Sequence, residues 1–287
     1  MPDSYPYHLQ SFKKEEVEVV YTDLGEGEQT LVFIHGLASY LPIWVKNIDY
    51  FKQYYRCIAI DLPGHGYSSK GDYPYTMTFY VEMVSALLKK LAVKKAILIG
   101  HSMGGQIAIF LATQAPMQFS HLVLAAPAGF ETFNGTQRAI LSQLASPQTL
   151  QYVQSLLNLK NYFHDLKEKD YSLLEELNGL LYQQTDASMG TILSKSMKGM
   201  LNEPVFDRLE KIIQPTLVLF GESDQLIPNR FFNNVSTQRI ALQGTSQIRN
   251  HKLRMMANCG HFLQYECAET FNKEVSTFLH NHVFVKV

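Results

Sequence analysis

A serine in a glycine-rich turn between an apolar segment and a helical one constrains this chain more than any other feature. Residues 94–100 (KKAILIG) predict a buried strand, and residues 100–105 (GHSMGG) follow it directly. Beyond the turn, apolar residues recur at helical spacing up to Pro116. A GxSxG sequence between a strand and a helix forces Ser102 into a tight turn, where a side chain at either flanking glycine would collide with the neighbouring backbone. The Ser102 hydroxyl is therefore a candidate nucleophile, and the helix N-terminus beside it offers N–H groups to an anion.

Strands and helices alternate on both sides of this turn. The alternating segment at residues 15–20 and the glycine turn at 25–27 predict an antiparallel hairpin that leads into a buried strand at 30–36 (TLVFIHG). Further strands are expected in these apolar segments: 55–66 (YRCIAIDLPGHG), 121–127 (HLVLAAP), 215–221 (PTLVLFG) and 252–261 (KLRMMANCGH). Apolar residues at helical spacing predict amphipathic helices over 76–91 and 264–280. This order predicts an α/β fold with a mostly parallel central sheet flanked by helices.

The alternation breaks between residues 131 and 213. No convincing strand occurs there, and leucine-rich segments such as 140–144 and 150–157 predict several helices. We therefore expect a core formed by residues 1–130 and 214–287, interrupted by a helical insertion at 131–213. Within the second part of the core, residues 236–238 and 249–252 are expected to be loops.

Composition excludes several classes of protein. The chain has 287 residues, of which 46% are hydrophobic and 18% charged, so it can bury a core and does not resemble a disordered chain. The formal net charge is −1, without the basic face that nucleic acid or anionic lipid would need. Apolar runs fall short of the roughly 18 residues of a membrane helix. We expect no nucleic-acid partner, no membrane span and a cytoplasmic location.

The three cysteines give no sign of a disulfide framework. Cys57, Cys259 and Cys267 are odd in number and form no CxxC pair, so neither a disulfide nor a zinc site is expected. A reducing compartment fits this pattern, and Cys259 is interpreted as a small buried apolar residue.

A serine hydroxyl is a weak nucleophile at neutral pH and needs a base, which in turn needs an acid to orient it. Both are present after later strands. Asp224 lies three residues past Gly221, at the end of the LVLF strand, and His261 follows the LRMMANCG strand directly.

With these residues the chain resembles the α/β-hydrolase fold superfamily, in its serine-hydrolase branch of capped, esterase- and lipase-like enzymes. The resemblance spans residues 15–280 apart from the insertion. Five segments carry it, in the order of that family: 32–37 (VFIHGL), 61–68 (DLPGHGYS), 100–105 (GHSMGG), 221–228 (GESDQLIP) and 260–261 (GH).

The resemblance implies a role for each matching residue. Ser102 would attack a carbonyl carbon, His261 would accept its proton, and Asp224 would orient the imidazole. The backbone N–H groups of Leu37 and Met103 would form the oxyanion hole. The insertion would form a cap over the carboxyl ends of the strands.

Other assignments stay open. Glu222 could replace Asp224, although the family spacing to Pro228 favours Asp224, and Asp61 and Glu131 also follow strands. The nearby histidines His35, His65 and His101 are interpreted as hydrogen-bonded scaffold residues. Neither a metal motif nor a GxGxxG fingerprint is present, so no metal and no cofactor are expected.

The apolar side chains of the insertion suggest a pocket for a small apolar ester, although most of them could simply join the cap to the core. These side chains are Leu141, Leu144, Leu156, Leu157, Tyr162, Tyr182, Met189, Met197 and Met200. We expect ester hydrolysis through an acyl-enzyme. The serine argues against the dehalogenases and epoxide hydrolases of this fold, which carry aspartate. Two alternatives remain: cleavage of a carbon–carbon bond in a diketone, with Arg138 or Arg208 holding an anionic group, and a small-molecule receptor with little turnover.

Overall fold

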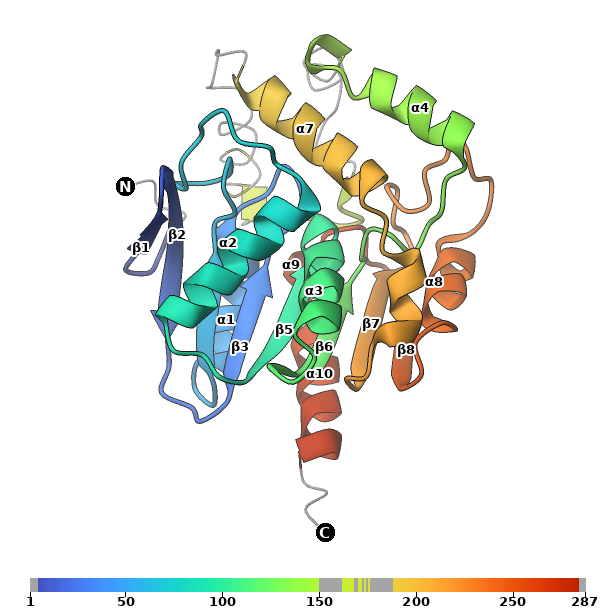
Figure 1. The fold of residues 1–287 in the computed structure, drawn as a ribbon. Coiled ribbons are helices and arrows are strands. Elements are labelled where there is room, and N and C mark those ends of the chain that lie inside the picture. The colour runs from blue at the N-terminus through green and yellow to red at the C-terminus, as the bar shows by residue number, and fades with distance from the viewer. Residues whose placement is uncertain are drawn as a thin grey trace.

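An eight-stranded sheet forms the centre of the molecule in the computed structural model, which describes residues 5–149, 162–167, 170, 171, 173, 175 and 188–283 (Figure 1). The strand order is β1-β2-β4-β3-β5-β6-β7-β8. The bounds are β1 Gln10–Lys14, β2 Val17–Leu24, β3 Thr30–Ile34, β4 Arg56–Ile60, β5 Ala96–His101, β6 Phe119–Ala125, β7 Thr216–Gly221 and β8 His251–Met256. Neighbouring strands from β4 to β8 are parallel, and β1 and β2 join them antiparallel. The mostly parallel sheet expected from the sequence is thus confirmed.

The hairpin differs from the expected one in its partner. β2 pairs antiparallel with β1 and with β4, whereas β3 pairs with β4 and β5. The sequence QSFKK of β1 is largely exposed, so it carries no apolar run that could identify it as a strand. β3, β5 and β7 are instead buried along their whole length because helices cover both of their sides.

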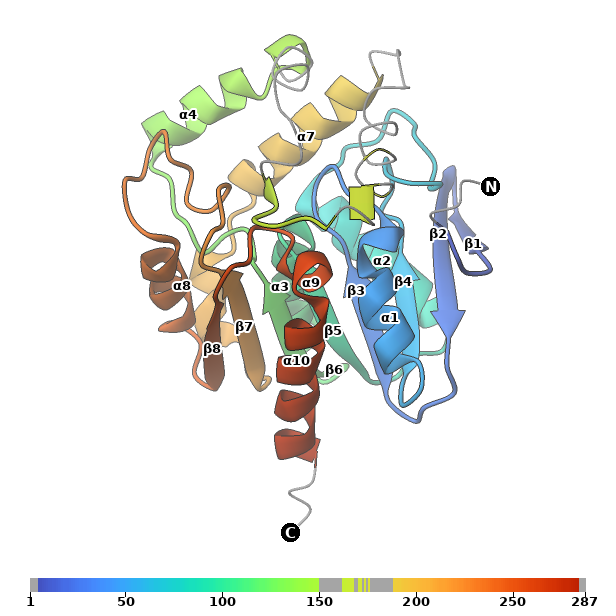
Figure 2. The same cartoon turned by 180° about the vertical axis from the view of Figure 1, so that it is seen from behind.

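Helices cover the two faces of the sheet in separate layers. α1 Val45–Phe51 and α10 Ala268–Val283 lie on one face (Figure 2), and α2 Met77–Lys90, α3 Met103–Gln114 and α8 Thr237–Thr245 lie on the other. The expected apolar face of α2 is buried against the core, with Met83, Val84 and Leu87 at most 4% exposed.

Three helical elements were not expected. The 3₁₀ helix η1 Leu41–Trp44 and α1 follow β3, and α8 begins where a loop was predicted. Ser236 is the N-cap of α8, and its hydroxyl accepts a hydrogen bond from the Arg239 amide. The polar residues taken for a loop are therefore a helix start, for which serine is a preferred residue. Likewise, the last two residues of the loop expected at 249–252, His251 and Lys252, belong to β8.

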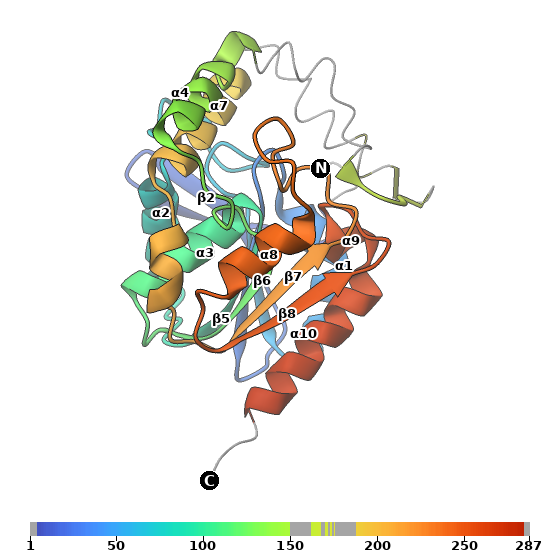
Figure 3. The same cartoon turned by 90° about the vertical axis from the view of Figure 1, so that its right-hand side faces the viewer.

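The region expected to form a cap contains helices in its described parts. α4 Gly135–Leu144 and α7 Ser188–Asn202 lie beside each other over the carboxyl ends of the strands (Figure 3), and the 3₁₀ helix η4 Phe206–Lys211 packs against α3. No strand occurs among the described residues between 131 and 213. The predicted helix at 150–157 and the residues Leu156, Leu157 and Tyr182 lie outside the described residues. None of the helices in the described ranges is long and apolar enough to cross a membrane.

The prediction that no cysteine is paired is wrong. Cys259 and Cys267 form a disulfide across a sequence separation of 8 residues, and Cys57 is a buried free thiol. The two paired cysteines lie on either side of the short helix α9 Leu263–Glu266. The chain turns at this helix, which brings the two sulfur atoms together. Because disulfides persist in oxidising surroundings, the cysteine argument for a reducing compartment no longer stands.

Candidate active site

Ser102 lies in a strained turn between β5, which ends at His101, and α3, which begins at Met103. Its backbone has φ 51° and ψ −118°, a conformation that non-glycine residues adopt at a cost of about 1–3 kcal/mol. Backbone hydrogen bonds hold it there: the Ser102 amide donates to the Ala125 carbonyl at 3.0 Å, and its carbonyl accepts from the Ala128 amide at 3.0 Å. The hydroxyl does not cap α3 and stays available for other contacts.

The glycines around Ser102 are required by close backbone approach. A Cβ atom at Gly100 would lie 2.4 Å from the Gly104 carbonyl oxygen, and one at Gly104 would lie 2.2 Å from the Ile34 carbonyl oxygen. Both distances are far below van der Waals contact. The steric role predicted for the flanking glycines is therefore confirmed.

Asp224 and His261 form a buried hydrogen-bonded pair. Asp224 follows β7 and His261 follows β8, and the Asp224 Oδ2 atom lies 2.9 Å from His261 Nδ1. The other oxygen, Oδ1, accepts from the amides of Leu226 at 2.8 Å and Ile227 at 3.0 Å. Both side chains of the pair are at most 3% exposed, whereas Glu222 is exposed to solvent. The carboxylate that contacts the imidazole is thus the one favoured by the family spacing.

His101 joins the His261 loop to the Ser102 turn. Its Nε2 atom lies 3.0 Å from the His261 carbonyl oxygen, and the centroids of the two rings are 4.8 Å apart. Burial lowers the pKa of His101 well below its usual value, so the ring is neutral and donates through Nε2. Since His101 precedes Ser102 directly, this contact brings His261 to the same edge of the sheet as the serine.

The two remaining acid candidates, Asp61 and Glu131, accept hydrogen bonds from other segments of the chain and have no contact with the His261 imidazole. Asp61 accepts hydrogen bonds from the Tyr5 hydroxyl at 2.7 Å and the Leu41 amide at 2.7 Å, and burial raises its pKa to about 6. Glu131 accepts from the Asn229 amide at 2.9 Å, and burial likewise raises its pKa.

The loop after β3 passes directly beside the serine. A Cβ atom at Gly36 would lie 2.9 Å from the Ser102 Cβ atom, so Leu37, the next residue, follows a backbone that lies against the serine turn. Within the described residues, neither the Leu37 amide nor the Met103 amide donates a hydrogen bond to another protein group. His35 steadies this loop, because its Nε2 atom accepts from the Leu62 amide at 3.0 Å.

A cavity of about 370 Å³ lies between helices α4 and α7 on one side and the segments that follow β6 and β7 on the other. Gln106 and Ala128 line it, and the amides of both residues donate to the Ser102 carbonyl, so the cavity adjoins the serine turn. Of the predicted pocket residues that are described, those that line the cavity are Leu141, Met197 and Met200. Others have different surroundings: Met189 is buried, Leu144 is exposed, and Tyr162 packs against the core.

The two arginines proposed for an anionic group lie in different places. Arg138 lines the cavity, whereas Arg208 stacks over the Phe110 ring, with 4.4 Å between its guanidinium carbon and the ring centroid. Only Arg138 could therefore reach a ligand in this cavity. Across the described parts of the chain, no group of three or more His, Cys, Asp or Glu side chains could hold a metal ion.

Two features near His261 were not found from the sequence. They are the disulfide between Cys259 and Cys267, and the carboxylate of Glu266, which binds the amide of Gly260 and the amide of His164 in a separate segment. The only sequence signal was the position of both Glu266 and Cys267 in the helix expected over 264–280, shortly after His261.

The chain is similar to hydrolases in both sequence and structure. Residues 29–268 match the family model of the alpha/beta hydrolase fold. The chain is 28% identical to the uncharacterized hydrolase YugF of Bacillus subtilis, over 94% of this chain and 97% of YugF. It is 27% identical to a 2-hydroxy-6-oxononadienedioate/2-hydroxy-6-oxononatrienedioate hydrolase of Burkholderia vietnamiensis, over 92% of this chain and 91% of that protein. Its structure resembles the crystal structure of a membrane phospholipase A, with a TM-score of 0.78 and 23% identity, covering 99% of this chain and 89% of that one.

The matched residues run from just before β3 to the first residue of α10 and include Ser102, Asp224 and His261. The strand order and the two helical layers agree with this family match. The chain therefore belongs to the alpha/beta hydrolase fold family, and its activity is that of a hydrolase.

Proposed function

We propose that this hydrolase cleaves a small, largely apolar carboxylic ester through an acyl-enzyme formed on Ser102. The 2.9 Å contact between His261 Nδ1 and Asp224 Oδ2 carries the proposal. A buried carboxylate at Nδ1 keeps the proton on that nitrogen, which leaves Nε2 free to accept the serine proton. The strained backbone of Ser102 supports the same reading, because such strain is concentrated at functional sites.

The reaction proceeds in two halves. His261 Nε2 takes the Ser102 proton while the serine oxygen attacks the ester carbonyl carbon, and the amides of Leu37 and Met103 stabilise the resulting oxyanion. The tetrahedral intermediate collapses as His261 returns the proton to the leaving alcohol. Water then loses a proton to His261, attacks the acyl-enzyme and releases the acid, and the proton returns to Ser102. Asp224 balances the imidazolium charge in both halves.

The cavity next to the backbone of the serine turn supports an apolar substrate; the described residues that line it include neither Ser102 nor His261. Its apolar lining comes from the proposed core, residues 1–130 and 214–287, and from the proposed cap, residues 131–213. Among the lining side chains are Pro127, Leu141, Met197, Met200, Leu226 and Ile227. Burying an alkyl or acyl group against such side chains is favourable at roughly 25 cal/mol per Å².

Hydrolysis of a carbon–carbon bond is the second candidate. It is favoured by the similarity to the Burkholderia hydrolase and by Arg138, which offers a cation at a cavity that Glu131 and Asp207 also line. The same Ser102 and His261 would act in that reaction, so substrate tests are needed to separate the two.

The deciding experiment is hydrolysis of p-nitrophenyl esters, from acetate to decanoate, by wild type, Ser102→Ala and His261→Ala. Ser246→Ala, at an exposed position after α8, is the matched control. Steady turnover that is lost in the two site variants and kept in the control would support ester hydrolysis. An inactive wild type whose Ser102 still reacts with a fluorophosphonate would favour carbon–carbon cleavage. Absence of labelling would overturn the serine-hydrolase proposal and favour a receptor.

A further inference from the structure

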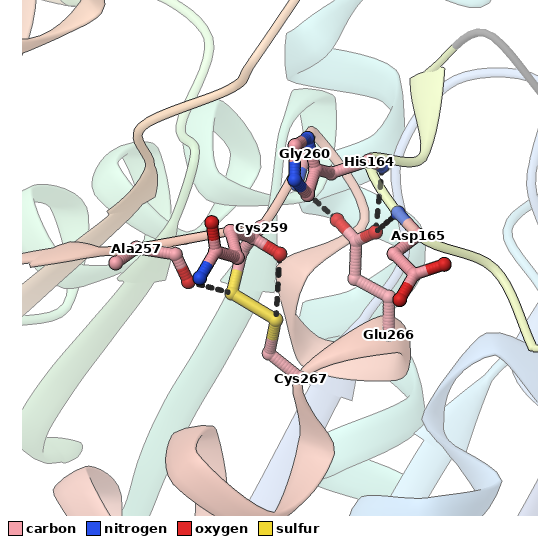
Figure 4. The surroundings of a disulfide bond; sticks show 8 residues. His164, Asp165, Ala257, Cys259, Gly260, Glu266 and Cys267 are labelled. Carbon is pink, nitrogen blue, oxygen red and sulfur yellow. Dashed lines mark hydrogen bonds between the residues drawn. A yellow bond between two sulfur atoms is a disulfide. The ribbon is translucent and has the colours of Figure 1, made fainter.

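The carboxylate of Glu266 binds two segments that are far apart in the sequence. Its Oε1 atom accepts a hydrogen bond from the Gly260 amide. Its Oε2 atom accepts from the amides of His164 at 2.7 Å and Asp165 at 3.3 Å (Figure 4). All three donors are backbone N–H groups, so the side chain joins the loop before α9 to a segment about a hundred residues earlier.

The same two segments also meet through His261 and its neighbour. The His261 amide donates to the Tyr162 carbonyl at 2.9 Å, and the rings of Phe163 and Phe262 stack with centroids 4.8 Å apart. A Cβ atom at Gly260 would lie 2.5 Å from the Tyr162 carbonyl oxygen, so only glycine permits this approach. The backbone of His261 is therefore held on the side that faces residues 162–165.

The helix that carries Glu266 is itself fixed to the His261 loop. Cys259 precedes Gly260, Cys267 follows Glu266, and the disulfide between them closes this segment. On the opposite side, His101 contacts the His261 carbonyl. The imidazole thus projects from a backbone that is bound at its amide, at its carbonyl and at the preceding residue.

A carboxylate is the group that these contacts require. Glu266 is partly buried, and burial raises its pKa although three amides donate to it. A glutamine in its place has one accepting oxygen, so its NH₂ group would face a backbone N–H on one of the two segments. The His261 loop and residues 162–165 could not both keep their hydrogen bonds to the side chain.

We propose that Glu266 is a positioning residue of the hydrolase: its carboxylate holds the His261 backbone against residues 162–165 and so sets the imidazole between Asp224 and Ser102. The proposal rests on the function proposed above for Ser102 and His261. Glu266 touches no reacting atom and acts only through the position of His261.

The test compares Glu266→Gln with Glu269→Gln, an exposed glutamate on α10. The rate at which a fluorophosphonate labels Ser102 is measured together with the low-field NMR signal of the His261 Nδ1 proton and the thermal stability. Glu266→Gln should label roughly ten- to a hundredfold more slowly, since small displacements of catalytic groups have effects of that size. Its Nδ1 signal should shift, and Glu269→Gln should match wild type in both measurements.

The outcomes separate the two proposals. A wild type that is not labelled overturns the serine-hydrolase function. A labelled wild type with Glu266→Gln at the wild-type rate and an unshifted Nδ1 signal overturns the role of Glu266, even if thermal stability falls. Should Glu266→Gln fail to fold, Glu266→Asp is measured in its place, because it keeps the carboxylate on a side chain that is one methylene group shorter. Slower labelling with a shifted signal would then support the proposal, and an unchanged rate would overturn it.

Discussion

Replacing Asp224 by asparagine should remove the activity while leaving the fold intact. The Oδ1 atom of Asp224 accepts from the amides of Leu226 and Ile227, and Oδ2 faces His261 Nδ1. Because the NH₂ group of asparagine cannot accept a hydrogen bond, the variant has to point its oxygen at the two amides. Its nitrogen then faces His261, where the aspartate oxygen stood.

The consequence is a change of tautomer in His261. A donor at the Asp224 position obliges Nδ1 to accept, which places the imidazole proton on Nε2, where it blocks proton transfer from Ser102. The expected loss in kcat is about 10⁴-fold. At 1.36 kcal/mol for each factor of ten, this corresponds to about 5.4 kcal/mol of transition-state stabilisation.

The measurement is kcat for the ester that wild type hydrolyses fastest, with thermal unfolding of both proteins. Glu222→Gln is the matched control, because that carboxylate lies two residues away and is exposed. The control should keep the wild-type kcat, and Asp224→Asn should keep most of its stability, since the two amide hydrogen bonds persist and the contact with His261 Nδ1 only reverses its direction. An Asp224→Asn variant with kcat near that of wild type would refute the assignment of Asp224 to His261.

Three further predictions concern stability. Gly104→Ala should not yield folded protein, because its Cβ would lie 2.2 Å from the Ile34 carbonyl oxygen; a native circular dichroism spectrum and a wild-type melting temperature would contradict this. Burial lowers the pKa of His65 to about 4, so the native state holds it neutral while the unfolded chain binds a proton below about pH 6.5. Its contribution to stability is therefore present above pH 6.5 and is lost on acidification. Urea unfolding should show that the free energy of unfolding falls between pH 7.5 and pH 4.5 by about 2.5 kcal/mol more in wild type than in His65→Gln. An equal fall in the two proteins would refute this prediction. Cys267→Ser removes a disulfide with a sequence separation of 8 residues, which should lower the free energy of unfolding by about 2.5 kcal/mol in non-reducing buffer; a variant as stable as wild type would argue against the bond.

Local patterns in the sequence were sufficient for the main elements and for the candidate site. The apolar runs of β3, β5 and β7 are buried on both sides, and the apolar face of α2 follows the helical period, so each pattern reports directly on its own segment. The turn at Ser102 could also be predicted from the sequence, because its glycines avoid clashes with residues that are close in sequence or on the adjacent strand. Polar segments were less informative: QSFKK formed β1, and the residues after Ser236 formed α8.

The pairing of distant residues was decided only by the tertiary structure. Asp224 and Glu222 follow the same strand and differ in that one is buried against His261 and the other is exposed. Arg138 and Arg208 have the same chemistry, yet only Arg138 lines the cavity. The contacts of Glu266 with His164 and Asp165 likewise join segments whose proximity no local pattern encodes. The cysteines of the disulfide are only 8 residues apart, but their pairing depends on the turn of the chain at α9. The sequence by itself determined which residues could do the chemistry, because residue type and local spacing are written in it; burial and proximity, which select among those residues, exist only once the chain has folded.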